Sequence, residues 1–264
     1  FVAPPYHYDA GIYEKRVYDG WGRPEPDHPL RFGPNIKDWP EQPALSDDLL
    51  LRVVSHITDP VTTTDELIPS GETSSYRSNP LRLAEFTLSR KDPGYVGRAK
   101  AVQAQDAARR AGTPDAETRE VYTALAAAGV QADPAAANIG SAIFANKPGD
   151  GSAREQAASC QRVLGGAANF ALEYATKRYR SNCINWGMLP FLTTEPDALP
   201  LGGYVFIPGV RAALLGKADE IPAWAVVPGE DGWQPKPITL RLGALTDAER
   251  QILADGCLIN YYKK

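Results

Sequence analysis

Cysteine is scarce in this sequence of 264 residues, which contains three: Cys160, Cys183 and Cys257. They lie far apart, and none belongs to a C-x-x-C pair. This pattern argues against a disulfide framework and against a metal or cluster site built from this chain alone. A reducing compartment is expected, which is the cytoplasm or, in a eukaryote, the mitochondrial matrix. Cys183 is expected to be a small buried residue rather than a nucleophile or a ligand.

Long apolar runs and a basic-then-apolar leader are also absent, so the sequence predicts no membrane span. The chain starts with Phe1 and Val2, which suggests a processed or truncated piece of a longer protein. Its histidines, His7, His28 and His56, show no Ser-His-Asp spacing of a hydrolase triad. The net charge of −4 and a pI of about 5.5 argue against nucleic acid as a partner, whereas a few buried arginines can still attract a small anion.

Proline, aromatic and charged residues are dense over 1–46, where no hydrophobic pattern is sustained. We predict an extended arm that lies against a folded body, with a disordered tail as the alternative. Residues 47–264 are predicted to form one domain, in which short apolar runs alternate with helical stretches. Helices are expected over 98–111, 115–129 and, with a cap, 246–257. This mixture predicts an α/β fold, with a mixed sheet flanked by helices.

The most informative stretch is GDGSARE, residues 149–155. Ser152-x-x-Glu155 after a glycine turn has the pattern of a capping box, which predicts a helix that begins at Ser152. The same start of a helix would suit an anion, because its first amides are unpaired and lie at the positive end of the helix dipole. Arg154 would add a clamp for a carboxylate. Ser152 would act as a base only if its pKa fell by about six units, or ~8 kcal/mol. Both interpretations stay open on the local pattern.

This stretch extends into a longer match. Residues 140–192 resemble the swivel domain of the aconitase and isopropylmalate isomerase family, with its pattern G-x-G-S-S-R-E-H-A-A, then L-G-G, then N-x-x-x-x-G-L-L-P. The matching residues are Gly149, Gly151, Ser152, Arg154, Glu155, Ala157, Ala158, Leu164, Gly165, Gly166, Asn182, Gly187, Leu189 and Pro190. Residues 61–79 resemble the family's T-T-D-H-I-S-P-A-G…Y-R-G stretch. The residues that align there are Thr63, Thr64, Asp65, Ile68, Gly71, Tyr76 and Arg77.

The resemblance implies a swivel-type α/β domain with a barrel-like core, which closes over a substrate bound to a [4Fe-4S] cluster. The cluster would be ligated outside this chain, on N-terminal domains of the same protein or on a large subunit, so the isolated chain is expected to be inactive. The implied reaction is the hydration or dehydration of a hydroxy-polycarboxylate such as citrate or isocitrate. By resemblance, Ser152 and Asp65 are catalytic, and the substrate-binding residues are Arg77, Arg154 and Ala153.

Three departures from the family pattern leave the substrate open. Ala153 stands where the family has a second serine, and Glu66 and Gln156 each stand where the family has a histidine. Two further hypotheses are a small subunit of an isopropylmalate-isomerase-like enzyme and a non-catalytic carboxylate-binding module. Without the resemblance, Arg77 would be interpreted as a surface arginine, and Asp65 as a cap of the turn that follows it.

Overall fold

The computed structural model describes the whole chain except residues 16–21, 30, 153 and 264. The chain divides into two compact units, Phe1–Pro34 and Asn35–Lys264. In its described part, the first unit contains one short helix, α1 (Gly11–Glu14), none of whose residues is buried. All the other described helices and strands belong to the second unit. None of the described helices is long and apolar enough to cross a membrane.

A seven-stranded mixed sheet forms the centre of the second unit, in the order β6-β5-β3-β1-β7-β8-β9. Its strands are β1 (Asp48–Ile57), β3 (Ala137–Ala145), β5 (Gly166–Ala171), β6 (Leu189–Leu192), β7 (Tyr204–Ile207), β8 (Ile221–Gly229) and β9 (Gly232–Leu240). The pairs from β6 to β1 are parallel, and the pairs from β1 to β9 are antiparallel. A separate parallel pair joins β2 (Thr62–Thr63) to β4 (Pro148–Asp150).

The two edges of the large sheet meet at one point. Leu192, the last residue of β6, pairs with Arg241, which follows β9, through two backbone hydrogen bonds of 2.6 and 3.0 Å. Because opposite edges touch, the sheet curls into a partly closed barrel. Its interior is filled by apolar side chains of the strands, among them Phe144, Phe170 and Phe191. The predicted mixed α/β fold with a barrel-like core is therefore confirmed.

The central strand β1 is buried on both faces, which explains its nearly continuous apolar sequence. Leu49 and Leu51 belong to the apolar cluster inside the curled sheet. Leu50 and Val54 belong to a second cluster, which lies under the helices. A strand in this position does not show the polar–apolar alternation of a strand with one wet face.

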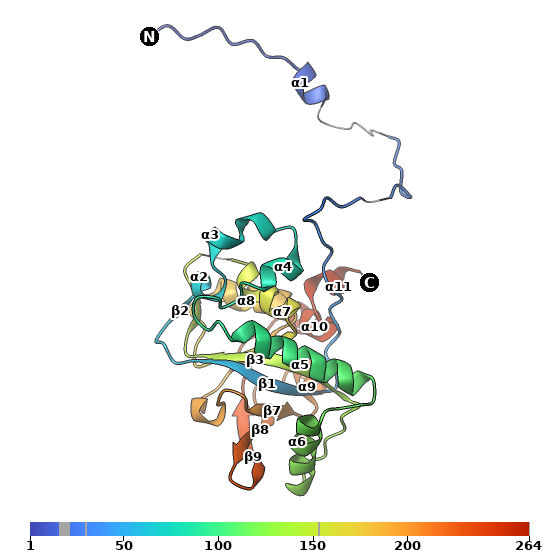
Figure 1. Ribbon diagram of the computed structural model, residues 1–264, viewed down its shortest axis with the longest axis vertical. Helices are drawn as coiled ribbons and strands as arrows, with labels where there is room; N and C mark the ends of the chain where they lie inside the picture. Colours follow the sequence, from blue (N-terminus) through green and yellow to red (C-terminus); the bar gives the residue numbers. More distant parts are fainter. Residues whose placement is uncertain (16–21, 30, 153, 264) are drawn as a thin grey trace. The chain divides into compact units, whose positions relative to one another are not determined.

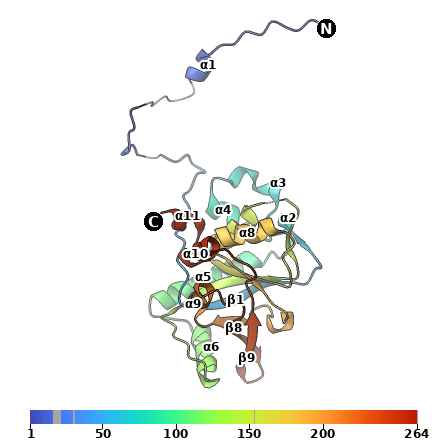
Figure 2. The same cartoon turned by 180° about the vertical axis from the view of Figure 1, so that it is seen from behind.

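The helices cover the sheet, as the two opposite views in Figures 1 and 2 show. The longer ones are α5 (Tyr95–Arg110), α6 (Ala116–Ala127), α7 (Gln156–Val163), α8 (Lys177–Asn185) and α10 (Asp247–Asp255). The shorter ones are α2 (Thr64–Leu67), α3 (Ser70–Thr73), η1 (Ser74–Tyr76), α4 (Pro80–Ala84), η2 (Pro196–Ala198), α9 (Val210–Leu215) and α11 (Leu258–Tyr262). The three predicted helices are confirmed as α5, α6 and α10, and Thr246 caps the last of them as expected.

Residues 35–46, here called the strap, run in extended form along the second unit. The Trp39 ring lies 4.5 Å from the Trp186 ring, between centroids. The Asn260 side chain donates a hydrogen bond of 2.9 Å to the carbonyl of Gln42. The strap is therefore fixed to the folded body, whereas the division of the chain at residue 46 into an arm and a domain stays a prediction.

Candidate carboxylate-binding site

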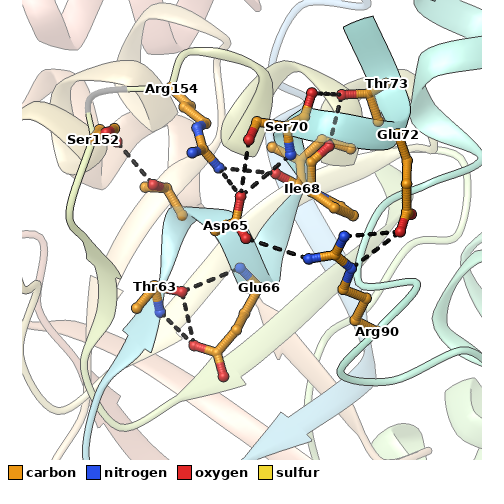
Figure 3. A network of polar contacts seen from close by, with 12 residues as sticks. Thr63, Asp65, Glu66, Ile68, Ser70, Glu72, Thr73, Arg90, Ser152 and Arg154 are labelled. Carbon is orange, nitrogen blue, oxygen red and sulfur yellow. Dashed lines mark hydrogen bonds and ion pairs between the residues drawn. The ribbon is translucent and has the colours of Figure 1, made fainter.

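The small parallel pair of β2 and β4 brings together two segments that are distant in the sequence. Thr63 at the end of β2 pairs with Asp150 at the end of β4. Since the strands are parallel, the segments that follow them, α2 and the loop 151–155, leave at the same end of the pair. Asp65 lies on α2, and Ser152 and Arg154 lie on the loop, so three of the predicted site residues share one region (Figure 3).

The capping box predicted for Ser152 and Glu155 is wrong. The helix α7 begins at Gln156 rather than at Ser152, and Glu155 is its N-cap residue without a side-chain cap bond. Gly151 has a φ of 85°, and the amide of Arg154 donates to the Ser152 carbonyl at 2.8 Å, so the chain forms a turn where a helix was expected. The Glu155 carboxyl does not cap the helix, and desolvation by burial raises its pKa.

Asp65 and Arg154 form an ion pair between Oδ1 and Nη1 (Figure 3). Both the amide and the hydroxyl of Ser70 donate to the same carboxylate oxygen at 3.2 Å. These contacts, that of Arg154 first, hold the pKa of Asp65 below its ordinary value. Asp65 thus supports the turn that follows it and also binds the guanidinium of Arg154.

A second guanidinium lies on the other oxygen of Asp65. Arg90 Nη1 is 3.5 Å from Asp65 Oδ2, and Arg90 Nη2 is 2.8 Å from Glu72 Oε1. The resulting row Arg154–Asp65–Arg90–Glu72 alternates in sign, and its charges balance. Arg90 and Glu72 were not predicted, because they match no family motif and lie in short polar segments without a periodic pattern. The charged run around Arg90 was the one signal that could have pointed to it.

The backbone of Ser152 is held by a hydrogen bond, whereas its side chain is exposed to solvent. The hydroxyl of Thr64, a buried residue, donates to the Ser152 carbonyl at 2.8 Å. The Ser152 side chain is exposed, and within the described part of the chain it makes no hydrogen bond. Its hydroxyl is therefore available to a ligand. Ala153, the third predicted residue of this loop, lies outside the described residues.

Arg77 follows η1 and is exposed. Among the described residues it has no hydrogen-bond or ion-pair partner. Its segment belongs to the group α2, α3 and α4, which lie next to α8 in both views of the fold (Figures 1 and 2). Both α2 and α4 pack on α7, the helix that continues the Ser152 loop. Arg77 thus has no charged partner among the described residues, and it lies in the segment between α2 and α4, the two helices that pack on α7.

Glu66, one of the departures from the family pattern, has a structural role. Thr63 and Glu66 form a capping box at the start of α2, in which the Thr63 amide donates to Glu66 Oε2 at 2.8 Å. Lys91 Nζ lies 3.1 Å from Glu66 Oε1 and 2.8 Å from Asp59 Oδ1. The glutamate therefore stabilises the short helix that carries Asp65.

The described residues do not fit an iron–sulfur cluster. They contain no group of three or more His, Cys, Asp or Glu side chains that could hold a metal ion. The three cysteines are free and buried, and Cys183 is fully buried as predicted. Burial raises the pKa of Cys183 to about 12 and also raises that of Cys160, whereas cluster ligands are thiolates.

Fold and site together define a mixed α/β domain that holds a row of carboxylates and guanidinium groups beside a small parallel strand pair. Neither a protein-family model nor a curated protein sequence matches the chain. Among solved structures, the chain is similar to a 3-isopropylmalate dehydratase (leuD) from Methanocaldococcus jannaschii. The two share 21% sequence identity with a TM-score of 0.49, over 82% of this chain and 93% of that chain.

Proposed function

We propose that this chain is the substrate-clamping domain of an aconitase-like hydro-lyase that hydrates or dehydrates a hydroxy-polycarboxylate. The observation that supports this most is the ion pair of Asp65 and Arg154, which are 89 residues apart in the sequence. Each belongs to one of the two stretches that separately resemble the family, 61–79 and 140–192. If the two resemblances were due to chance, the two stretches would not have to be in contact in the fold. If both stretches contribute to one active site, they must lie close together.

Arginines would bind the carboxylates of the substrate. Arg154 uses one nitrogen, Nη1, for Asp65, and its Nε and Nη2 bond to no other described residue. These two donors form a fork that suits a second carboxylate. Asp65 would orient this fork, and Arg77, which pairs with no other described residue, would bind another carboxylate of the substrate. Fixed positive groups of this kind hold a polycarboxylate in one orientation for proton transfer.

Ser152 would remove the proton next to a substrate carboxylate. Its hydroxyl is exposed, its backbone is held by Thr64, and the guanidinium of Arg154 on the same loop favours a negative oxygen. A [4Fe-4S] cluster on N-terminal domains of the same protein or on a large subunit would supply the Lewis acid for the leaving hydroxyl. Because the described residues do not hold that cluster, this chain alone should be inactive.

A second candidate is the small subunit of an isopropylmalate-isomerase-like enzyme. One observation favours it: Asn35–Lys264 is a single compact unit with its own buried core, as a separate subunit needs. The chemistry of Ser152 and the arginines would be the same. The two candidates differ in whether the cluster belongs to the same chain or to another one.

The test is a hydratase assay of this chain together with its cluster-bearing part, after anaerobic reconstitution, with a panel of hydroxy-polycarboxylates. Ser152→Ala should lower kcat about 100-fold or more, because it removes the base. Arg154→Lys should mainly raise KM, because lysine lacks the fork. Arg178→Ala is the matched control, since Arg178 is exposed and bonds to no other described residue.

Two outcomes would overturn this proposal. Full activity of Ser152→Ala would remove Ser152 from the mechanism. Binding of a polycarboxylate without any turnover by the reconstituted protein would instead identify the chain as a non-catalytic carboxylate-binding module.

A further inference from the structure

The first residue of the strap contacts the chain on both sides of Arg77. Asn35 Nδ2 donates to the carbonyl of Ser75 at 2.6 Å. Asn35 Oδ1 lies 3.4 Å from Asn79 Nδ2. Ser75 precedes Arg77 by two residues, and Asn79 follows it by two. The Asn35 side chain, from a distant part of the sequence, therefore contacts the segment that carries Arg77, whose guanidinium has no partner among the described residues.

A backbone hydrogen bond also joins the strap to this segment. The amide of Lys37 donates to the carbonyl of Ser78 at 3.0 Å. The strap itself is fixed farther along, where the Trp39 ring packs on Trp186 at 4.5 Å between centroids. The contacts of Asn35 and Lys37 with the segment 75–79 thus come from a strap that is itself held on the folded body.

Arg77 depends on this support because its own side chain has no partner among the described residues. Its neighbours are fixed: the Tyr76 ring lies 5.5 Å from the Phe86 ring, and the Arg82 guanidinium lies 5.5 Å from the Tyr76 ring centroid. Asn79 is also the N-cap of α4, since its Oδ1 accepts from the Arg82 amide at 3.1 Å. Because no described residue holds the guanidinium, the position of the Arg77 backbone limits where this side chain can reach.

We infer that Asn35 is a positioning residue for Arg77: it holds the segment 75–79 so that this guanidinium meets a substrate carboxylate. The inference rests on the proposed function of Arg77. It extends the site to the strap, which lies within the stretch 1–46 that is predicted as an extended arm. Asn35 itself acts through the backbone of Ser75 and the side chain of Asn79 and does not touch the substrate.

The first readout is kinetic, in the reconstituted enzyme. Asn35→Asp keeps the size of the side chain but removes the donor to Ser75, and it should raise KM for the polycarboxylate about three- to tenfold with kcat within about twofold. Asn35→Gln keeps an amide donor, so its KM should lie between that of the unmodified enzyme and that of Asn35→Asp. Asn260→Ala is the matched control, because Asn260 holds the strap at Gln42, away from Arg77.

The second readout does not depend on catalysis. In hydrogen–deuterium exchange of the full chain, Asn35→Asp should speed exchange in peptides that cover 74–80, and Asn260→Ala should not. Unchanged exchange in Asn35→Asp, or an equal change in both variants, would overturn the inference. An unchanged KM in Arg77→Ala would overturn the proposed role of Arg77 instead, whatever the exchange shows.

Discussion

Gly149 shows how a single residue fixes the approach of the Ser152 loop to the body of the domain. Its φ is 91°, and a Cβ at this position would lie 2.3 Å from the Cβ of Tyr179. Tyr179 is buried, and the hydroxyl of Thr176 donates to the Gly149 carbonyl at 2.8 Å. The loop can therefore lie on α8 only because position 149 has no side chain.

Gly149→Ala should destabilise the protein by about 2–4 kcal/mol, because the positive φ and the overlap with Tyr179 both add strain. Urea unfolding followed by circular dichroism measures this. Gly202→Ala is the matched control: Gly202 has a φ of 84°, but no atom lies within 4 Å of a Cβ built there. It should cost about 1–2 kcal/mol for the backbone alone. Equal losses in the two variants would exclude the overlap as a cause.

At the scale of elements, the short helix α2 is held to the Ser152 loop by polar contacts. Thr64 bonds to the backbone of Ser152, and Asp65 bonds to the side chain of Arg154. Arg90 approaches the same carboxylate from the other side. The strength of this link therefore depends on the charge of Asp65.

The stability of the protein should change with pH through Asp65. Its pKa is lowered in the folded state, so its contribution is complete above the unfolded value near 4 and is lost as the pH falls through the folded value. Its side chain is 46% exposed, so solvent screening limits the contribution to less than about 1 kcal/mol.

In Asp65→Asn, the urea midpoint should therefore decline less steeply between about pH 6 and pH 3 than in the unmodified chain. The exposed Asp231, in the turn between β8 and β9, provides the control variant Asp231→Asn, whose decline should match that of the unmodified chain. Parallel curves for Asp65→Asn and the unmodified chain would contradict the role of this carboxylate.

At the scale of the whole molecule, the strap belongs to the second compact unit, Asn35–Lys264. Arg162, which is buried, donates from Nη2 to the carbonyls of Pro43 and Gly256 at 3.0 and 3.2 Å. Burial lowers the pKa of this guanidinium to about 10. Its charge is thus compensated in part by a carbonyl that the strap supplies.

A chain that begins at Asn35 should unfold at the same urea concentration as the full chain, because Phe1–Pro34 is a separate unit. A chain that begins at Ser46 should be less stable by about 2 kcal/mol or more, because Arg162 loses an acceptor and Trp186 loses its aromatic partner. Thermal and urea unfolding of the three chains tests this. Equal midpoints for all three would show that the strap contributes nothing.

The sequence by itself determined the elements whose signal is local. The alanine-rich helices α5 and α6 follow from their periodic apolar residues, and their predicted ends differ from the observed ones by a few residues at most. The mixed α/β class follows from the alternation of short apolar runs with helices. The resemblance predicts one site for Asp65 and Arg154, and the two side chains are in contact; their roles stay a prediction.

Only the tertiary structure decided which local patterns are realised. The pattern Ser/Thr-x-x-Glu occurs at 63–66, 152–155 and 246–249, and the first and third form capping boxes. The second does not, because Gly151 turns the chain and Glu155 is the N-cap residue of α7 rather than a residue of its first turn. The closure of the sheet edges and the hydrogen bonds between the strap and the segment 75–79 depend likewise on residues far apart in the sequence, which local propensity does not relate.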